Sequence, residues 1–324
     1  MAERIRKCAV CGGLIDEEDL FCANCGTEAP DMGEPRSALP AQTSTHNFTC
    51  DGCGASMSYD ASAQTLRCPF CGSERLSKQD DIRSIAPRRI IRFAIDHQRA
   101  SSILRQWLGQ GFWRPGDLAS AAELTKVSAV YVPYWVFQAR THTHWTADSS
   151  DLPIGASGDW RPVFGEHQGV YEGVLIGASG VLTPHETSEL CPFDLAAAEP
   201  ASAVDTENVI VEQFRVQRKY ARPQARNGLE NLDYDACQRY VPARCRNLRV
   251  NVLLEGLSSE PVLLPVWMMA YRYRDQLFRF LVNGQTGRAT GQAPVSWRKI
   301  LGAIAIVGLI GILLCLALLA FAGR

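Results

Sequence analysis

Eight of the twelve cysteines stand in four C-x-x-C pairs near the start of the chain, and a glycine follows each pair. The pairs are Cys8/Cys11, Cys22/Cys25, Cys50/Cys53 and Cys68/Cys71. Glycine tolerates the left-handed backbone of a tight knuckle and lets backbone N–H groups turn toward the sulfurs. Ten residues separate the first two pairs and fourteen the last two, which suits a short β-hairpin joining two pairs around one tetrahedral ion. The spacing predicts two zinc ribbons with four cysteine ligands each.

The alternatives for these cysteines are disulfides, a redox C-x-x-C motif, and iron in place of zinc. The N-terminal MAERIRKCAV contains no apolar signal segment, so export to a disulfide-forming compartment is not indicated. A redox motif does not come in fours, whereas iron stays open as a second choice of metal. Four protein thiolates per ion leave no coordination position for catalysis, so both Zn²⁺ ions are expected to be structural. Their binding would contribute on the order of 10 kcal/mol of folding free energy.

The charge of the cysteine-rich region bears on what it binds. Residues 1–80 contain seven Lys/Arg and twelve Asp/Glu, so their formal charge is 7 − 12 = −5. Each zinc ion with four thiolates adds a further −2. Nucleic-acid phosphates attract the opposite sign, so the region favours protein partners over nucleic acid.

The chain ends in a long apolar run. Residues 301–322 carry no charge, and at about 1.5 Å per residue they would form a helix of roughly 33 Å, enough for a hydrocarbon core of about 30 Å. Two positive residues, Arg298 and Lys299, precede the run, and one, Arg324, follows it. This difference weakly favours a cytoplasmic location for the residues before the run. The sequence predicts a tail-anchored, single-pass membrane protein, with the lipid bilayer as one partner.

Between the ribbons and the apolar run the pattern indicates a β-rich body. The predicted elements are a helix over 100–108, strands over 127–145 and 169–178, a largely helical stretch from 224 within 206–245, and a hairpin of 262–274 with 277–283. V-P-Y-W at 132–135 is echoed by L-P-V-W at 264–267, which suggests two related lobes or merely a shared way of starting a core strand.

The expected fold class is therefore α+β: two small four-cysteine zinc ribbons, a β-rich mixed soluble body and one C-terminal transmembrane helix. The predicted units are ribbon 1 (1–28), a flexible linker (29–46), ribbon 2 (47–77), the body (78–296) and the anchor (297–324).

Several segments together resemble a family of bacterial zinc-ribbon membrane proteins. Beside the ribbons and the final apolar helix they are W-L…R-P-G-D-L, V-Y-V-P-Y-W-V-F-Q-A, L-P-V-W…Y-R-Y and F-L-V-N-G-Q-T-G-R-A-T-G-Q-A-P-V-S-W-R-K-I. The resemblance covers nearly the whole chain, although the N-terminal ribbon is not a fixed feature of the family. Its members are often mislabelled primosomal helicase-like. They look like accessory proteins of membrane-stress systems, so the resemblance implies protein partners of the SPFH or phage-shock type.

Several segments of the chain bear on catalysis. The chain contains no G-x-x-x-x-G-K-[ST] and no Gly-Lys dipeptide, so the helicase reading is not supported. G-A-S-G at 155–158 and at 177–180 lacks the last glycine of G-x-S-x-G. The segment 283–287 reads as an anion-cradling loop or, preferably, as a hairpin end. Cys191, Cys237 and Cys245 have no histidine close by in sequence, so no catalytic residue is assigned.

One histidine set keeps a metal-dependent enzyme open. His142 and His144 are two residues apart on a predicted strand, so they share a face and, with His167, form a possible ligand set. The preferred reading is nevertheless a non-enzymatic adaptor at the inner membrane, whose ribbons and body bind protein partners in a membrane-stress response. The alternatives are a membrane-tethered nucleic-acid-binding regulator and a metal-dependent enzyme. No small-molecule substrate is evident.

Overall fold

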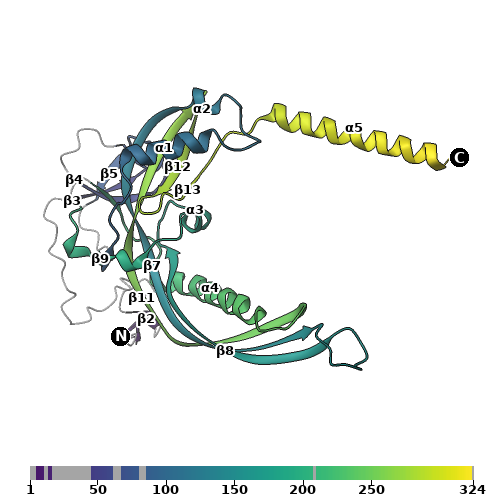
Figure 1. The fold of residues 1–324 in the computed structure, drawn as a ribbon. Helices are drawn as coiled ribbons and strands as arrows, with labels where there is room; N and C mark the ends of the chain where they lie inside the picture. The colour runs from purple at the N-terminus through teal and green to yellow at the C-terminus, as the bar shows by residue number, and fades with distance from the viewer. Residues whose placement is uncertain are drawn as a thin grey trace.

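Two very long strands, β7 (Glu123–Ser149) and β11 (Cys245–Tyr273), form the axis of the molecule (Figure 1). Both are rich in valine and aromatic residues, which favour a pleated, half-buried surface. They pair antiparallel over nearly their whole length, from Glu123 opposite Arg272 to Ser149 opposite Cys245. Every other strand of the main sheet is arranged around this pair.

The computed structural model describes residues 5–10, 14–16, 45–60, 67–79, 85–206 and 209–322. The strands are β1 (Ile5–Lys7), β2 (Leu14–Asp16), β3 (Thr45–Cys50), β4 (Ser56–Asp60), β5 (Leu76–Gln79), β6 (Arg89–Ile90), β7, β8 (Arg161–Gly177), β9 (Glu199–Pro200), β10 (Ile210–Glu212), β11, β12 (Gln276–Asn283) and β13 (Ala289–Gly291). The helices are α1 (His97–Leu108), α2 (Leu118–Ala121), α3 (Pro184–Glu189), α4 (Arg218–Gln238) and α5 (Trp297–Ala322), with 3₁₀ turns at Leu195–Ala197 and Ala201–Ala203.

At one end of the long pair the sheet is broad and forms the body. Within the described ranges its strand order is β13-β12-β11-β7-β10-β4-β3-β5, and β6 joins β11 to β9. All neighbours are antiparallel except β10 with β7 and β6 with β11, so the sheet is mixed. Its core holds buried side chains from β7, β11 and β12, among them Val132, Leu264 and Leu281. The predicted helix over 100–108 is α1, which packs Leu104 into a second cluster with Phe280.

At the other end β8, β7 and β11 continue as a curved, three-stranded arm, and α4 lies inside the curve (Figure 1). The helix faces the arm with buried residues at a spacing of four: Ala221, Ala225, Leu229, Asp233 and Cys237. It begins six residues before the predicted start at 224, with Pro223 inside it. The opposite face of the arm carries no helix in the described part of the chain.

The arm bends where the register of all three strands shifts. The pairing of β7 with β8 slips between Phe137 and Gln138, and that of β11 with β7 slips between Glu255 and Ser258. Gly173 and Gly256 take positive φ angles at these slips. An extra residue in one strand bends that strand locally, so the bulges separate the body from the arm.

The V-P-Y-W and L-P-V-W segments lie side by side in the centre of the sheet. Pro133 stands opposite Leu263, and Pro265 stands opposite Tyr131. The indole N–H groups of Trp135 and Trp267 each donate to a backbone carbonyl at 2.8 Å. The echo thus marks two strands with matching contacts in one sheet, and no separate lobes are formed by the described residues.

The predicted membrane anchor at 297–324 is contradicted. Among the residues that the structure describes, no helix is both long enough and apolar enough to cross a membrane. The expectation of a tail-anchored, single-pass inner-membrane protein with a cytoplasmic bulk is corrected accordingly.

The predicted α+β class is also wrong. The described chain is mostly β-sheet, and the strands of the predicted second ribbon are not a separate small unit. β4 pairs with β10, with Met57 opposite Glu212, so β3, β4 and β5 extend the main sheet. Hydrophobic spacing indicated the strands but carried no information on their long-range pairing, which merges ribbon and body.

Candidate metal centre

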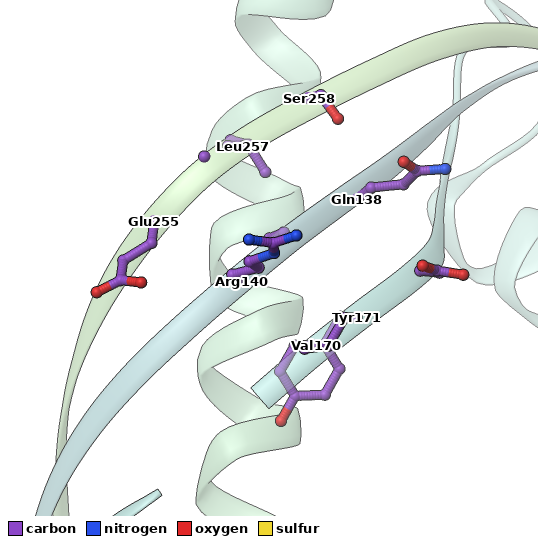
Figure 2. Close-up of a pocket in the computed structure, with 10 residues that line it drawn as sticks. Gln138, Arg140, Val170, Tyr171, Glu255, Leu257 and Ser258 are labelled. Carbon is purple, nitrogen blue, oxygen red and sulfur yellow. The ribbon is translucent and has the colours of Figure 1, made fainter. Parts of the chain in front are cut away.

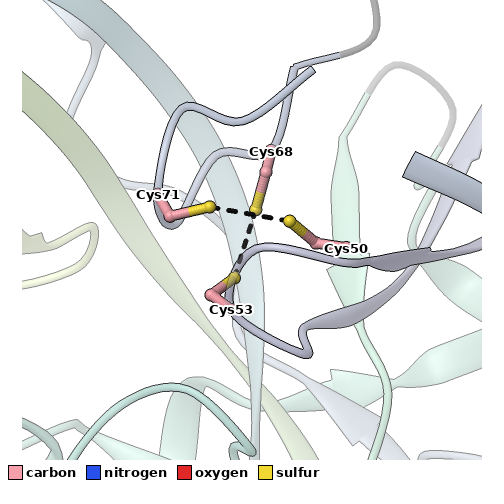
Figure 3. Close-up of side chains that lie close together, drawn as sticks. All are labelled: Cys50, Cys53, Cys68 and Cys71. Carbon is pink, nitrogen blue, oxygen red and sulfur yellow. Dashed lines mark hydrogen bonds between the residues drawn. The ribbon is translucent and has the colours of Figure 1, made fainter. Parts of the chain in front are cut away.

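Four cysteines converge where β3 and the loop before β5 meet the body. The sulfurs of Cys50, Cys53, Cys68 and Cys71 all lie within 4.8 Å of one another and point toward a common centre (Figure 3). Sγ of Cys50 lies 3.5 Å from that of Cys71, and Sγ of Cys53 lies 3.6 Å from that of Cys68. Sulfurs bound to zinc at about 2.3 Å with tetrahedral angles lie about 3.8 Å apart, so the donor set fits Zn²⁺ closely.

Both knuckles have the same backbone, as the repeated C-x-x-C-G unit predicts. The N–H of Gly54 donates to the carbonyl of Cys50 at 2.8 Å, and that of Gly72 donates to Cys68 at 2.9 Å. The two glycines have φ angles of 74° and 76°. A residue with a Cβ is strained there, so the predicted need for glycine after each pair is confirmed at these two positions.

The centre is built into the core of the body. Cys50 and Cys68 have no exposed surface and belong to the cluster that contains Val132 and Leu281. Lys126 of β7 reaches the same region, where its ammonium donates to the carbonyl of Arg67 at 2.8 Å. A metal here would therefore join the end of β3 to the loop before β5, beside the core of the body.

The thiols differ in acidity. Burial opposes ionisation of Cys50, but hydrogen bonds from the backbone N–H groups of Cys53 and Gly52 outweigh it and lower its pKa to about 7. Burial raises the pKa of Cys53 to about 11 and that of Cys68 further. A divalent cation offsets this cost because it stabilises all four thiolates together.

The first predicted ribbon is described only in part. β1 and β2 pair antiparallel, and the N–H of Val10 approaches Cys8 Sγ at 3.4 Å. Cys11, Cys22 and Cys25 lie outside the described residues. The described residues thus contain one four-cysteine group, and the second zinc ion stays a prediction.

The three predicted histidines do not come together. His142 and His144 lie on the outer face of the arm beside Glu166 of β8. His167 lies on the other face, 3.4 Å from Asp233 of α4 and 3.1 Å from the hydroxyl of Tyr240. Adjacent residues of a strand point to opposite faces, so Glu166 rather than His167 completes the group.

Asp233 joins α4 to the inner face of the arm. Its fully buried carboxylate accepts hydrogen bonds from the hydroxyls of Thr141 at 3.0 Å, Thr143 at 2.7 Å and Tyr171 at 2.5 Å. Sequence analysis missed this residue. Its position could have indicated it, because Asp233 falls in a row of small and apolar residues spaced four apart along 221–237. An aspartate on such a buried helix face needs hydrogen-bond partners.

A hollow of about 570 Å³ lies at the bend of the arm (Figure 2). Arg140 stands between Glu255 on β11 and Val170 on β8, its register partners on either side. The lining carries charges of both signs, and the bulges at Gly256 and near Gln138 account for the opening in the sheet.

The V-N-G-Q-T-G segment is a turn held by its own asparagine. The Asn283 side-chain oxygen accepts from the N–H groups of Gln285 and Thr286 at 2.8 and 2.9 Å, and its amide donates to the carbonyls of Leu190 and Pro192. The N–H groups that a bound anion would use are thus already paired, which favours the hairpin-end reading.

Comparison with known proteins adds one relative. The chain is similar to the "Uncharacterized protein YdjG" of Bacillus subtilis (strain 168), with 24% identity across 78% of this chain and 92% of that protein. No protein-family profile and no solved structure matches the chain. The description of the relative names no activity or ligand, so the function has to be inferred from the residues of this chain.

Proposed function

We propose that this protein is a non-enzymatic adaptor, in which structural zinc holds the cysteine-rich edge of the sheet and the outer face of the arm binds a protein partner. Four thiolates fill the coordination sphere of a tetrahedral ion and leave no position for a substrate. Because Cys50 and Cys68 are part of the main core, the ion would act on the stability of the sheet and not on chemistry.

The observation that carries the proposal is the apolar surface of the arm. Phe164, Val170 and Leu253 are 83%, 68% and 61% exposed. Their register partners on β7 are Thr146, Arg140 and His142, respectively. These partners alternate along β7 with residues that face α4. Phe164, Val170 and Leu253 therefore project from the outer face of the arm. Three large, exposed apolar side chains along a face that no described helix covers favour a protein-binding surface.

The class of partner comes from the family resemblance. It suggests proteins of the SPFH or phage-shock type, and the net charge of −5 over residues 1–80 disfavours nucleic acid. The adaptor proposal does not depend on that class being right, because the apolar face would bind another protein by the same burial of surface.

Site-specific photocrosslinking in cells tests the proposal. A photoreactive amino acid at position 164 of the full chain is expected to capture one defined protein. The same probe at Ser188, an exposed position of α3, serves as the control. Substituting Phe164, Val170 and Leu253 together by serine should reduce recovery of that protein about tenfold or more, since each buried side chain contributes on the order of 1–2 kcal/mol. Equal capture at positions 164 and 188, or none at 164, would contradict an interaction through this face.

A further inference from the structure

A second group of metal-ligating side chains lies on the outer face of the arm. It consists of His142 and His144 from β7 and Glu166 from β8, whose ligand atoms all lie within 4.8 Å of one another. Glu166 stands directly opposite His144 in the β7–β8 register. The two imidazole rings stack with their centroids 4.9 Å apart. The strand register alone brings the three side chains together.

The separations within this group match those of ligands on one ion. Nε2 of His142 lies 3.2 Å from one carboxylate oxygen of Glu166, and Nδ1 of His144 lies 3.4 Å from the other. Nitrogen and oxygen ligands bound to zinc at about 2.05 Å with tetrahedral angles lie about 3.3 Å apart. The three side chains thus need only small rotations to converge on a metal.

We propose that His142, His144 and Glu166 form a metal site for a divalent ion of the zinc, nickel and copper group. Imidazole suits these ions, and a carboxylate supplies the negative charge that two neutral imidazoles lack. The residues of β7 next to the two histidines point to the other face. There the hydroxyls of Thr141 and Thr143 donate to the carboxylate of Asp233.

Three protein ligands leave at least one coordination position free for water or an external ligand. The side chains of His142, His144 and Glu166 are 28%, 59% and 62% exposed, so the ion would exchange with solution. This site differs from the four-cysteine centre, which is closed by four ligands and has Cys50 and Cys68 fully buried, and it is independent of the adaptor proposal.

Calorimetric titration of the zinc-loaded full chain with Ni²⁺ tests the site. Wild-type protein is expected to bind one Ni²⁺ per chain in addition to the zinc already held. His144→Ala and, separately, Glu166→Gln should weaken this binding by about 100-fold or more, since loss of even a supporting group around a metal costs 10–100-fold. His185→Ala, which removes an exposed histidine outside the group, should bind Ni²⁺ as the wild type does.

A second readout places the ion without relying on the variants. Paramagnetic Ni²⁺ should broaden the NMR signals of residues around 142–144 and 166 first, and those near Cys50 and Cys68 should stay sharp. The proposal is overturned if wild-type protein binds no Ni²⁺, if both variants bind as well as wild type, or if the broadening centres elsewhere. The last outcome would show that Ni²⁺ binds other residues of the chain.

Discussion

The two groups of metal ligands in this protein differ in almost every physical respect. The four-cysteine centre has soft, negatively charged ligands on two C-x-x-C segments, and its fully buried Cys50 and Cys68 belong to a core cluster. The histidine–glutamate group has borderline ligands on two adjacent strands and stands in solvent. The first would join the end of β3 to the loop before β5, at the edge of the sheet. The second lies on β7 and β8, which pair through their backbones whether or not a metal is bound. A metal bound there would therefore not be needed for folding.

The largest effect is expected at the cysteine centre. Cys68→Ser should lower the zinc content by one ion per chain and the stability by on the order of 5 kcal/mol, because a closed site loses both a ligand and its place in the core. Metal analysis and thermal unfolding measure the two effects. Cys245→Ser, a half-buried cysteine outside the group, is the control. An unchanged zinc content in Cys68→Ser would show that the four sulfurs are not ligands.

In the arm, the buried carboxylate of Asp233 links α4 to the inner face of the sheet. We therefore expect Asp233 to stabilise the arm, as the four-cysteine centre stabilises the body. Asp233→Ala should destabilise the protein by about 3 kcal/mol, since the hydroxyls of Thr141, Thr143 and Tyr171 lose their acceptor. Urea unfolding measures the change, and Asp235→Ala, exposed on the same helix, is the control. If both variants unfold alike, α4 is not fastened through this residue.

The stability of the sheet is expected to depend on pH, because Glu212 of β10 is buried between β4 and β7. Burial raises the pKa of Glu212 to about 7, against hydrogen bonds from Ser179 and the N–H of Gly180. A raised carboxyl pKa means that the folded state holds the proton more tightly, so this contribution is complete below pH 4.5 and is lost as the pH rises through 7. Glu212→Gln should therefore stabilise the protein by on the order of 2 kcal/mol at pH 8 and by little at pH 4.5. Thermal unfolding of both proteins between pH 4.5 and pH 8 measures the difference in stability. A stabilisation that does not change with pH would rule out the ionisation of Glu212 as its cause.

The smallest effect is expected at the histidine–glutamate group. Without added metal, Glu166→Gln should change stability by less than about 0.5 kcal/mol, because exposed ion pairs contribute little. Chemical unfolding in a chelator that leaves the zinc in place provides the measurement. A loss of 2 kcal/mol or more would mean that this group is structural, and the contrast between the two regions would fail.

Local features of this fold were readable in the sequence. The knuckle glycines Gly54 and Gly72 and the β11–β12 hairpin are confirmed, although the turn falls at Arg274–Asp275, one residue earlier than predicted. Such features depend on neighbours a few residues away. The pairing of β7 with β11 joins residues 96 to 149 positions apart, and no pattern in either strand specifies its partner.

The choice between Glu166 and His167 shows why the arm site was only partly predicted. His167 was favoured because of its residue type, but a shift of one residue along a strand moves a side chain to the other face. Only the register, Glu166 opposite His144, decides between them. The fold class was wrong for the same reason, since β4 and β10 pair across more than 150 residues.

The long separation of β7 and β11 has a consequence for biosynthesis. β7 is complete at residue 149 and β11 begins at residue 245, so at 5–20 residues per second the ribosome needs about 5 to 20 seconds to reach the start of the second strand. During that interval one edge of the nascent β7–β8 hairpin has no partner from β11, and unpaired edges of this kind promote aggregation. Yield from overexpression should therefore depend on chaperones that shield emerging chains, and a slower rate of translation would lengthen the exposure.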